Sequence, residues 1–262
     1  MRFIPFERKL FEKQGQHHLV QVFERGARRE LRFGNHIVQS SYIPDAPDVL
    51  QLDYTRAMLM AFVLSPGVLR VLHIGLGGGT LPRFIHRHFP DVQQRIVELS
   101  PEVVEAAYAC FDLPRSPRLI VWAGNGAEHV RKDRSSYDVI FVDAFTAEGA
   151  ASEIQQPETL RLFRARLAPG GWLVCNAWGS DPQGLSRLTQ DLMQVVPTLF
   201  SISVRVNSNV IFFGKVDTAL PMPLELMTRA RELAREIPLE FHQFVPRLRR
   251  VRTGASALHV PL

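Results

Sequence analysis

The stretch Val71–Phe84, VLHIGLGGGTLPRF, constrains the fold of this chain more than any other part of the sequence. It starts as a short apolar run typical of a buried strand, passes through glycines and continues in a pattern that predicts a helix. Gly75, Gly77, Gly78 and Gly79 permit backbone conformations and close approaches that larger residues prevent. Because free N–H groups at a helix start favour polar ligand atoms, the stretch predicts a nucleotide-binding turn, although a plain tight turn has a similar pattern.

Apolar runs and helical patterns alternate from Arg70 to Trp178, starting with RVLHI and ending with GWLVCNAW. Near-continuous apolar strands separated by amphipathic helices are typical of a parallel sheet covered on both faces. Further on, SISVRV and VIFFGKV flank Asn207, Ser208 and Asn209, which favour a turn. We therefore predict an α/β fold whose parallel sheet ends in an antiparallel hairpin.

A smaller β region precedes this α/β part. Residues His18–Tyr42 alternate between apolar and polar side chains, which predicts a β-hairpin region, and a Pro- and Asp-rich joint follows at Ile43–Val49. A helix is expected over Tyr54–Leu64. We divide the chain into an N-terminal β region, 1–53, and a cofactor-binding catalytic domain, 54–262. A last helix is expected over Leu224–Glu236, and the arginine-rich tail beyond it has no assigned role.

Composition narrows the class of protein. With 46% hydrophobic and 22% charged residues, the 262-residue chain is ordinary globular material, and no apolar run approaches the length of about 18 residues that a membrane helix needs. Cys110 and Cys175 fall within an expected helix and strand, which indicates reduced core thiols and a cytoplasmic setting. The net charge is +5, but the arginine clusters lack interleaved aromatic residues, so we expect solvated surfaces and no nucleic-acid partner.

Polar residues follow successive strands of the predicted sheet, at the edge where open parallel sheets bind ligands. Glu98 ends RIVEL about 20 residues after the glycines, where an acid can accept hydrogen bonds from both ribose hydroxyls. Asn125 and Gly126 follow the next strand. Two roles are open for Asn125, a helix N-cap and a contact with an adenine edge. Asp143 ends YDVIFVD, where a buried charge needs a polar task.

These motifs resemble the spermidine synthase family of polyamine aminopropyltransferases, within the class I S-adenosylmethionine-dependent methyltransferase superfamily. The resemblance implies a Rossmann-like, mostly parallel seven-stranded sheet, a small N-terminal β region and a homodimer. It matches IGLGGGT to the family's glycine loop, Glu98 to its ribose acid, GNGAE to its adenine-side motif and VDAFTAEG to its catalytic loop. Asp143 is then the candidate base that deprotonates the attacking amine.

Two weaker matches extend this site. Gln39 resembles a cofactor-contacting glutamine of the family, and Tyr54 an active-site tyrosine. The implied co-substrate is S-adenosylmethionine or its decarboxylated form, which donates a group to an amine or another small acceptor. No metal ion is expected.

The chain also departs from the family pattern. Spermidine-making members carry an acid within the glycine loop, which holds the ammonium group of the substrate, and this chain has Gly78 there. Because such an acid repels a carboxylate, its absence leaves room for intact S-adenosylmethionine. A second acid of the catalytic loop is replaced by Thr146, and Glu148, two residues on, is either its substitute or a solvated loop residue.

Three functions are therefore compatible with the sequence. The first is a spermidine synthase-like transferase that moves an aminopropyl group, or alternatively a methyl group. The second is a non-catalytic relative that binds a nucleoside and has lost the acids of the polyamine site. The third is an NAD-dependent oxidoreductase, which fits the glycines and Glu98 but leaves Asp143 and the turn LAPGGWLV without a role.

Overall fold

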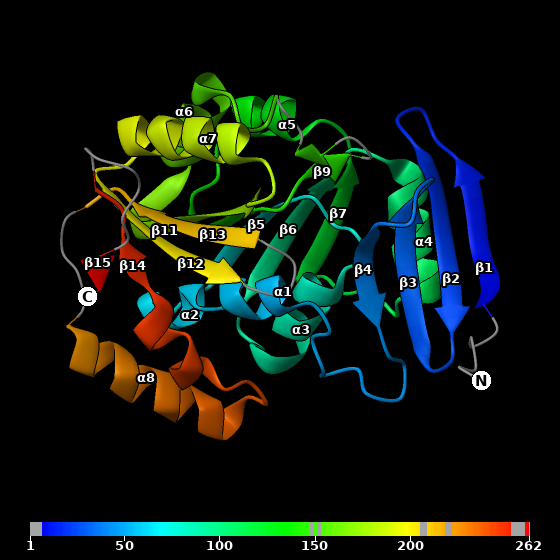
Figure 1. Ribbon diagram of the computed structural model, residues 1–262, viewed down its shortest axis with the longest axis horizontal. Coiled ribbons are helices and arrows are strands. Elements are labelled where there is room, and N and C mark those ends of the chain that lie inside the picture. The colour runs from blue at the N-terminus through cyan, green and yellow to red at the C-terminus, as the bar shows by residue number, and fades with distance from the viewer. Residues whose placement is uncertain are drawn as a thin grey trace.

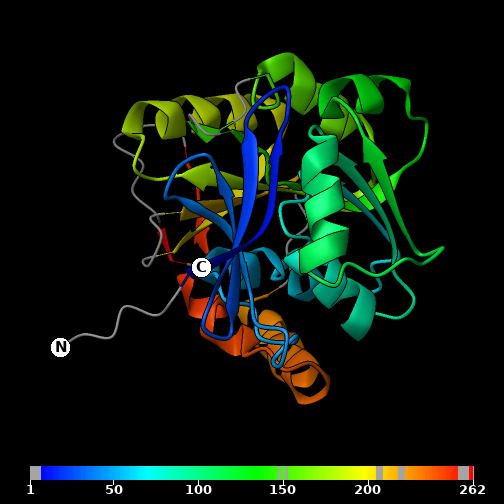
Figure 2. The same cartoon turned by 90° about the vertical axis from the view of Figure 1, so that its right-hand side faces the viewer.

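An antiparallel sheet forms the N-terminal part of the computed structural model, which describes residues 7–146, 149–150, 153–204, 209–217, 222–252 and 260–261. Its four strands pair in chain order. They are β1 (Glu7–Gln14), β2 (Leu19–Arg25), β3 (Arg28–Phe33) and β4 (Val38–Tyr42). The sheet packs against helix α4 (Pro101–Cys110) and stands beside the central sheet (Figures 1 and 2).

The central sheet is mostly parallel and has the order β15-β14-β12-β13-β11-β8-β5-β6-β7. Five of its described strands run parallel, and four of these are β5 (Arg70–Ile74), β6 (Gln93–Glu98), β7 (Leu119–Ala123) and β8 (Tyr137–Val142). The other half contains β11 (Leu167–Trp178), β12 (Thr198–Val204), β13 (Asn209–Lys215), β14 (Arg249–Arg250) and β15 (Val260–Pro261). Strands β12 and β13 form the expected antiparallel hairpin, and two turn residues, Asn207 and Ser208, lie outside the described part of the chain.

Helices cover both faces of this sheet, as Figure 1 shows. One face carries α1 (Asp53–Met58), α2 (Ala61–Leu64), α3 (Thr80–His88), α8 (Pro223–Glu236) and the short helices η1 (Phe241–Gln243) and η2 (Val245–Arg247). The opposite face carries α5 (Gly126–Lys132), α6 (Pro157–Ala165) and α7 (Pro182–Val195). A two-stranded ribbon, β9 (Phe145–Thr146) and β10 (Gly149–Ala150), follows β8.

The observed fold agrees with the predicted one and adds detail. The seven main strands, β5 to β8 and β11 to β13, form the expected sheet, and the two-residue strands β14 and β15 extend it to nine. The N-terminal region is a four-stranded sheet and not only a hairpin, because the charged segment Glu7–Gln14 forms an edge strand. The domain boundary after residue 53 stays a prediction.

The helix expected over Tyr54–Leu64 is interrupted. The N–H of Met60 donates to the carbonyl of Ala57, and that of Phe62 to the carbonyl of Leu59, both at 3.0 Å. These bonds span three residues instead of four, so the backbone tightens between α1 and α2. The apolar run MLMAFVL carries no glycine or proline that predicts this break.

Both cysteines are buried and free, as expected for core thiols. None of the helices in the described ranges is long and apolar enough to cross a bilayer.

The central strand β8 supplies a test of the core. Phe141 is 1% exposed and belongs to the same hydrophobic cluster as Phe200 and Phe213. Phe141→Ala should lower the free energy of unfolding by about 3–5 kcal/mol, because it removes buried surface and leaves a cavity. Leu224→Ala, at a side chain that is 78% exposed, should change it by less than about 0.5 kcal/mol. Equal losses in urea unfolding would contradict this placement of the core.

Candidate active site

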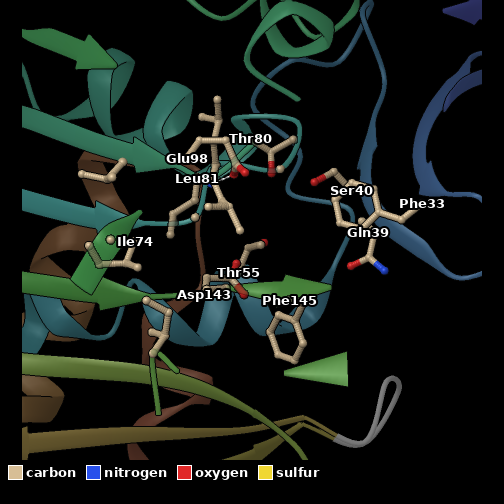
Figure 3. A pocket seen from close by; sticks show the side chains of 18 of the residues that line it. Phe33, Gln39, Ser40, Thr55, Ile74, Thr80, Leu81, Glu98, Asp143 and Phe145 are labelled. Carbon is tan, nitrogen blue, oxygen red and sulfur yellow. Dashed lines mark hydrogen bonds between the residues drawn. The ribbon is translucent and has the colours of Figure 1, made fainter. Parts of the chain in front are cut away.

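A pocket opens at the edge of the sheet where β5, β6 and β8 end, facing β4 and the start of α1 (Figure 3). Eight of the ten site residues predicted from the sequence line it: Gln39, Tyr54, Gly75, Gly77, Glu98, Asn125, Gly126 and Asp143. Gly78 and Gly79 are absent from the lining. The fold thus brings together residues that are up to 104 positions apart, from Gln39 to Asp143.

The backbone of Gly75, in the glycine loop, packs directly against the loop that follows β8. Its φ is +98°, and a Cβ atom on it would lie 2.1 Å from the carbonyl oxygen of Asp143. Next to this contact, the N–H of Asp143 donates to the carbonyl of Ile74 at 2.9 Å. Only glycine permits both this conformation and this approach.

Gly78 has a packing role behind the pocket. A Cβ atom there would lie 2.7 Å from the ring of Phe111, which is fully buried, and 3.0 Å from Cβ of Ser40. The N–H of Gly78 donates to Oγ of Ser40 at 2.8 Å. An acidic side chain at this position therefore has no room unless the buried ring of Phe111 moves.

The Glu98 carboxylate lies at the end of β6 and is held by backbone N–H groups. Leu76 donates to one oxygen at 2.8 Å and Ser100 to the other at 2.9 Å. Burial raises the pKa of Glu98, while these backbone hydrogen bonds oppose the rise. Glu98 also lines the pocket, and its hydrogen bonds with ribose hydroxyls stay a prediction.

Asn125 is the N-cap of α5. Its side-chain oxygen accepts from the N–H of Glu128 at 3.0 Å, and its amide nitrogen donates to Glu153 at 2.9 Å. The capping role is therefore observed. Because Asn125 and Gly126 also line the pocket, a contact with an adenine edge stays a prediction that is compatible with the cap.

The Asp143 carboxylate follows β8 and accepts hydrogen bonds from side chains. Asn176 donates its side-chain amide to Oδ1 of Asp143 at 2.8 Å, and the hydroxyl of Tyr54 donates to the same carboxylate. Asn209 in turn donates to the side-chain oxygen of Asn176 at 2.9 Å. Burial raises the pKa of Asp143, and the bonds from Asn176 and Tyr54 oppose that shift. The pKa of Tyr54 is raised well above its ordinary value by burial and by the charge of Asp143.

The structure also identifies site residues that were not predicted. Ser40 reaches the glycine loop from β4, and Asn176 reaches Asp143 from β11. Asn176 carries a signal in the sequence, an amide within the apolar run WLVCNAW, but Ser40 depends on how two separate sheets pack. Glu148 lies outside the described residues, as does the side chain of Thr146. No cluster of metal-ligand side chains was found in the described part of the chain.

Comparisons with known proteins place this geometry in context. The chain matches no family model. It is 30% identical over 247 residues to the polyamine aminopropyltransferase of Chromobacterium violaceum, an alignment that covers 94% of this chain and 95% of the relative.

Similar solved structures include the following two. Human methyltransferase-like protein 13, in complex with SAH, has 25% identity and a TM-score of 0.65, with 71% of this chain and 92% of that chain covered. A spermidine synthase in complex with the transition-state analogue AdoDATO has a TM-score of 0.74 over 90% of this chain and 84% of that one. Its identity is 18%, so this second likeness shows the fold alone.

Asp143→Asn tests the burial of the central carboxyl group. The folded state holds the pKa of Asp143 above its ordinary value of 3.8, so folding disfavours the ionised form. Below the ordinary pKa, the carboxyl group is protonated in both the folded and the unfolded wild type, and its contribution to stability is fully present. As the pH rises through the folded-state pKa, the unfolded protein releases this proton more readily, so the wild type loses that stability. The variant should therefore gain stability over the wild type as the pH rises above about 4, until the gain levels off. Urea unfolding of both proteins across this range measures the difference, and a gain that shrinks with rising pH would contradict it.

Proposed function

This chain belongs to the polyamine aminopropyltransferase family and is a transferase, and from that premise we propose that it transfers a group from an S-adenosyl cofactor to an amine acceptor. The observation that carries the proposal is the common pocket of Glu98, the glycine loop and Asp143. A nucleoside bound to the first two has its reactive end directed toward the third. The SAH complex of the similar methyltransferase-like structure supports the same cofactor class.

Each residue has a defined task in this proposal. Glu98 accepts hydrogen bonds from the ribose hydroxyls, and Asn125 and Gly126 face the base. Gln39 lies across the pocket from Glu98 (Figure 3), and we assign to it a contact with the reactive part of the cofactor. The pocket contributes to the rate by aligning the acceptor with the bond that breaks.

The chemical step is a displacement at a carbon bonded to a sulfonium. The acceptor nitrogen bonds to that carbon, the C–S bond breaks, and its electron pair remains on the sulfur of the leaving thioether nucleoside. The proton of the nitrogen passes to Asp143, directly or through water. A raised pKa makes the ionised carboxylate of Asp143 a stronger base, and its bonds from Asn176 and Tyr54 fix its orientation.

Two forms of the cofactor compete in this proposal. Aminopropyl transfer from the decarboxylated form is supported by the 30% identical relative and its name. Methyl transfer from intact S-adenosylmethionine is supported by the packing at Gly78, where Phe111 leaves no room for the acid that holds an ammonium group. The methyltransferase-like structure with SAH also favours it. The homodimer, the cytoplasmic setting and the absence of a nucleic-acid partner stay predictions.

Glu98 variants test the cofactor pocket. Glu98→Ala should weaken the binding of S-adenosylmethionine at least tenfold, about 1.4 kcal/mol, because the variant loses the acceptor for the ribose and the partner of the loop N–H groups. Glu98→Gln keeps the size of the side chain, so its affinity for S-adenosylmethionine should lie between those of the wild type and Glu98→Ala. Asp143→Asn should leave cofactor affinity within about twofold and lower turnover. Unchanged calorimetric affinity in Glu98→Ala would count against the whole assignment.

A titration series separates the remaining alternatives. Wild-type protein is titrated with S-adenosylmethionine, its decarboxylated form, methylthioadenosine and NAD. We expect S-adenosylmethionine to bind at least as tightly as the decarboxylated form, and NAD not to bind. A clear preference for the decarboxylated form would overturn the interpretation of Gly78. Tight nucleoside binding without product from any amine would support the non-catalytic interpretation instead.

A further inference from the structure

A second hollow adjoins the cofactor pocket beyond Asp143. We call it the outer pocket, and it shares Gln39, Tyr54 and Phe145 with the cofactor pocket. Its remaining lining residues are Ile37, Val38, Leu52, Asn176, Trp178 and Asn209. An acceptor that reaches Asp143 from the side opposite the nucleoside occupies this hollow. Its side chains therefore determine which acceptors fit, if the proposed function holds.

The outer pocket is uncharged, because none of the described side chains that line it carries a charge. Phe145 and Trp178 form an aromatic wall, with ring centroids 6.1 Å apart in an edge-to-face arrangement. Among the three amides of the lining, Asn176 is committed to Asp143 and Asn209 to Asn176. Among the described residues, only Asp143, which lines the adjoining cofactor pocket, offers a carboxylate to a bound amine.

The described acids near the outer pocket do not add a carboxylate to its lining. Asp53 follows the lining residue Leu52, but it does not line the hollow and is ion-paired with Arg56. Glu153 lines only the cofactor pocket and accepts a hydrogen bond from Asn125. Outside the described ranges, the sequence has one acidic side chain, Glu148.

We infer that the acceptor is an amine with a single cationic group on an apolar or aromatic body, and not a diamine. Asp143 compensates one ammonium group, and the apolar body gains free energy by leaving water against Trp178, Phe145 and the aliphatic side chains. A second ammonium group at the far end loses its hydration without gaining a carboxylate partner. Aromatic rings attract cations, but this attraction only partly replaces the lost hydration.

Two matched amines isolate the second charge. n-Pentylamine and 1,4-diaminobutane have the same number of heavy atoms and differ in a methyl or an ammonium group at one end. Both are titrated calorimetrically into the full-length protein, with and without saturating methylthioadenosine. We expect pentylamine to bind at least tenfold more tightly, about 1.4 kcal/mol. Tighter or equal binding of the diamine, or no binding of either amine, overturns the inference.

A pair of variants reverses the expected preference. Trp178→Glu adds a carboxylate to the outer pocket, whereas Trp178→Gln changes the shape similarly without a charge. The ratio of diamine affinity to pentylamine affinity should be at least tenfold higher in Trp178→Glu than in Trp178→Gln. In Glu148→Gln, loss of diamine binding with pentylamine binding retained would identify Glu148 as a second carboxylate and would overturn the inference.

The same titrations separate this inference from the proposed function. Failure of every nucleoside to bind removes the proposed function, while the amine titrations without nucleoside still test the outer pocket. Nucleoside binding with a preference for the diamine removes only the inference. Product formation from pentylamine with either cofactor supports both.

Discussion

The approach of the Gly75 backbone to the Asp143 carbonyl is the contact on which the site depends. It brings the end of β5 against the end of β8 with no side chain between them, and the hydrogen bond from Asp143 to Ile74 closes the same junction. The glycine loop and Asp143 are therefore fixed relative to each other by backbone atoms. Backbone junctions in a close-packed core resist adjustment, so the distance between the glycine loop and Asp143 is largely set by the fold.

Buried acids give this site its chemical character and also reduce its stability. Glu98 and Asp143 both have raised pKa values because burial disfavours their charges, and both are compensated by neutral donors and not by cations. Glu98 relies on backbone N–H groups, and Asp143 relies on Asn176 and Tyr54. A cation beside either acid would compensate the charge more strongly, but it would repel a sulfonium in the same pocket.

Much of the fold and site could be predicted from the sequence, because the relevant signals are local. Strand-end positions identified Glu98 and Asp143, and the structure places both in the pocket. The strand Glu7–Gln14 was missed because a charged, exposed edge strand lacks apolar alternation, and the break between α1 and α2 leaves no mark in an apolar run. Ser40 could not be predicted, because its role arises only when β4 packs beside the glycine loop.

That contact between Ser40 and Gly78 crosses the boundary drawn after residue 53. Gln39, the neighbour of Ser40, also lines the pocket, so one wall of the pocket belongs to the N-terminal sheet. The N-terminal sheet and the α/β part are thus not independent modules joined by a linker. A nucleoside that spans both parts acts as a cross-link between them, and the two parts are expected to exchange or recombine between proteins only together.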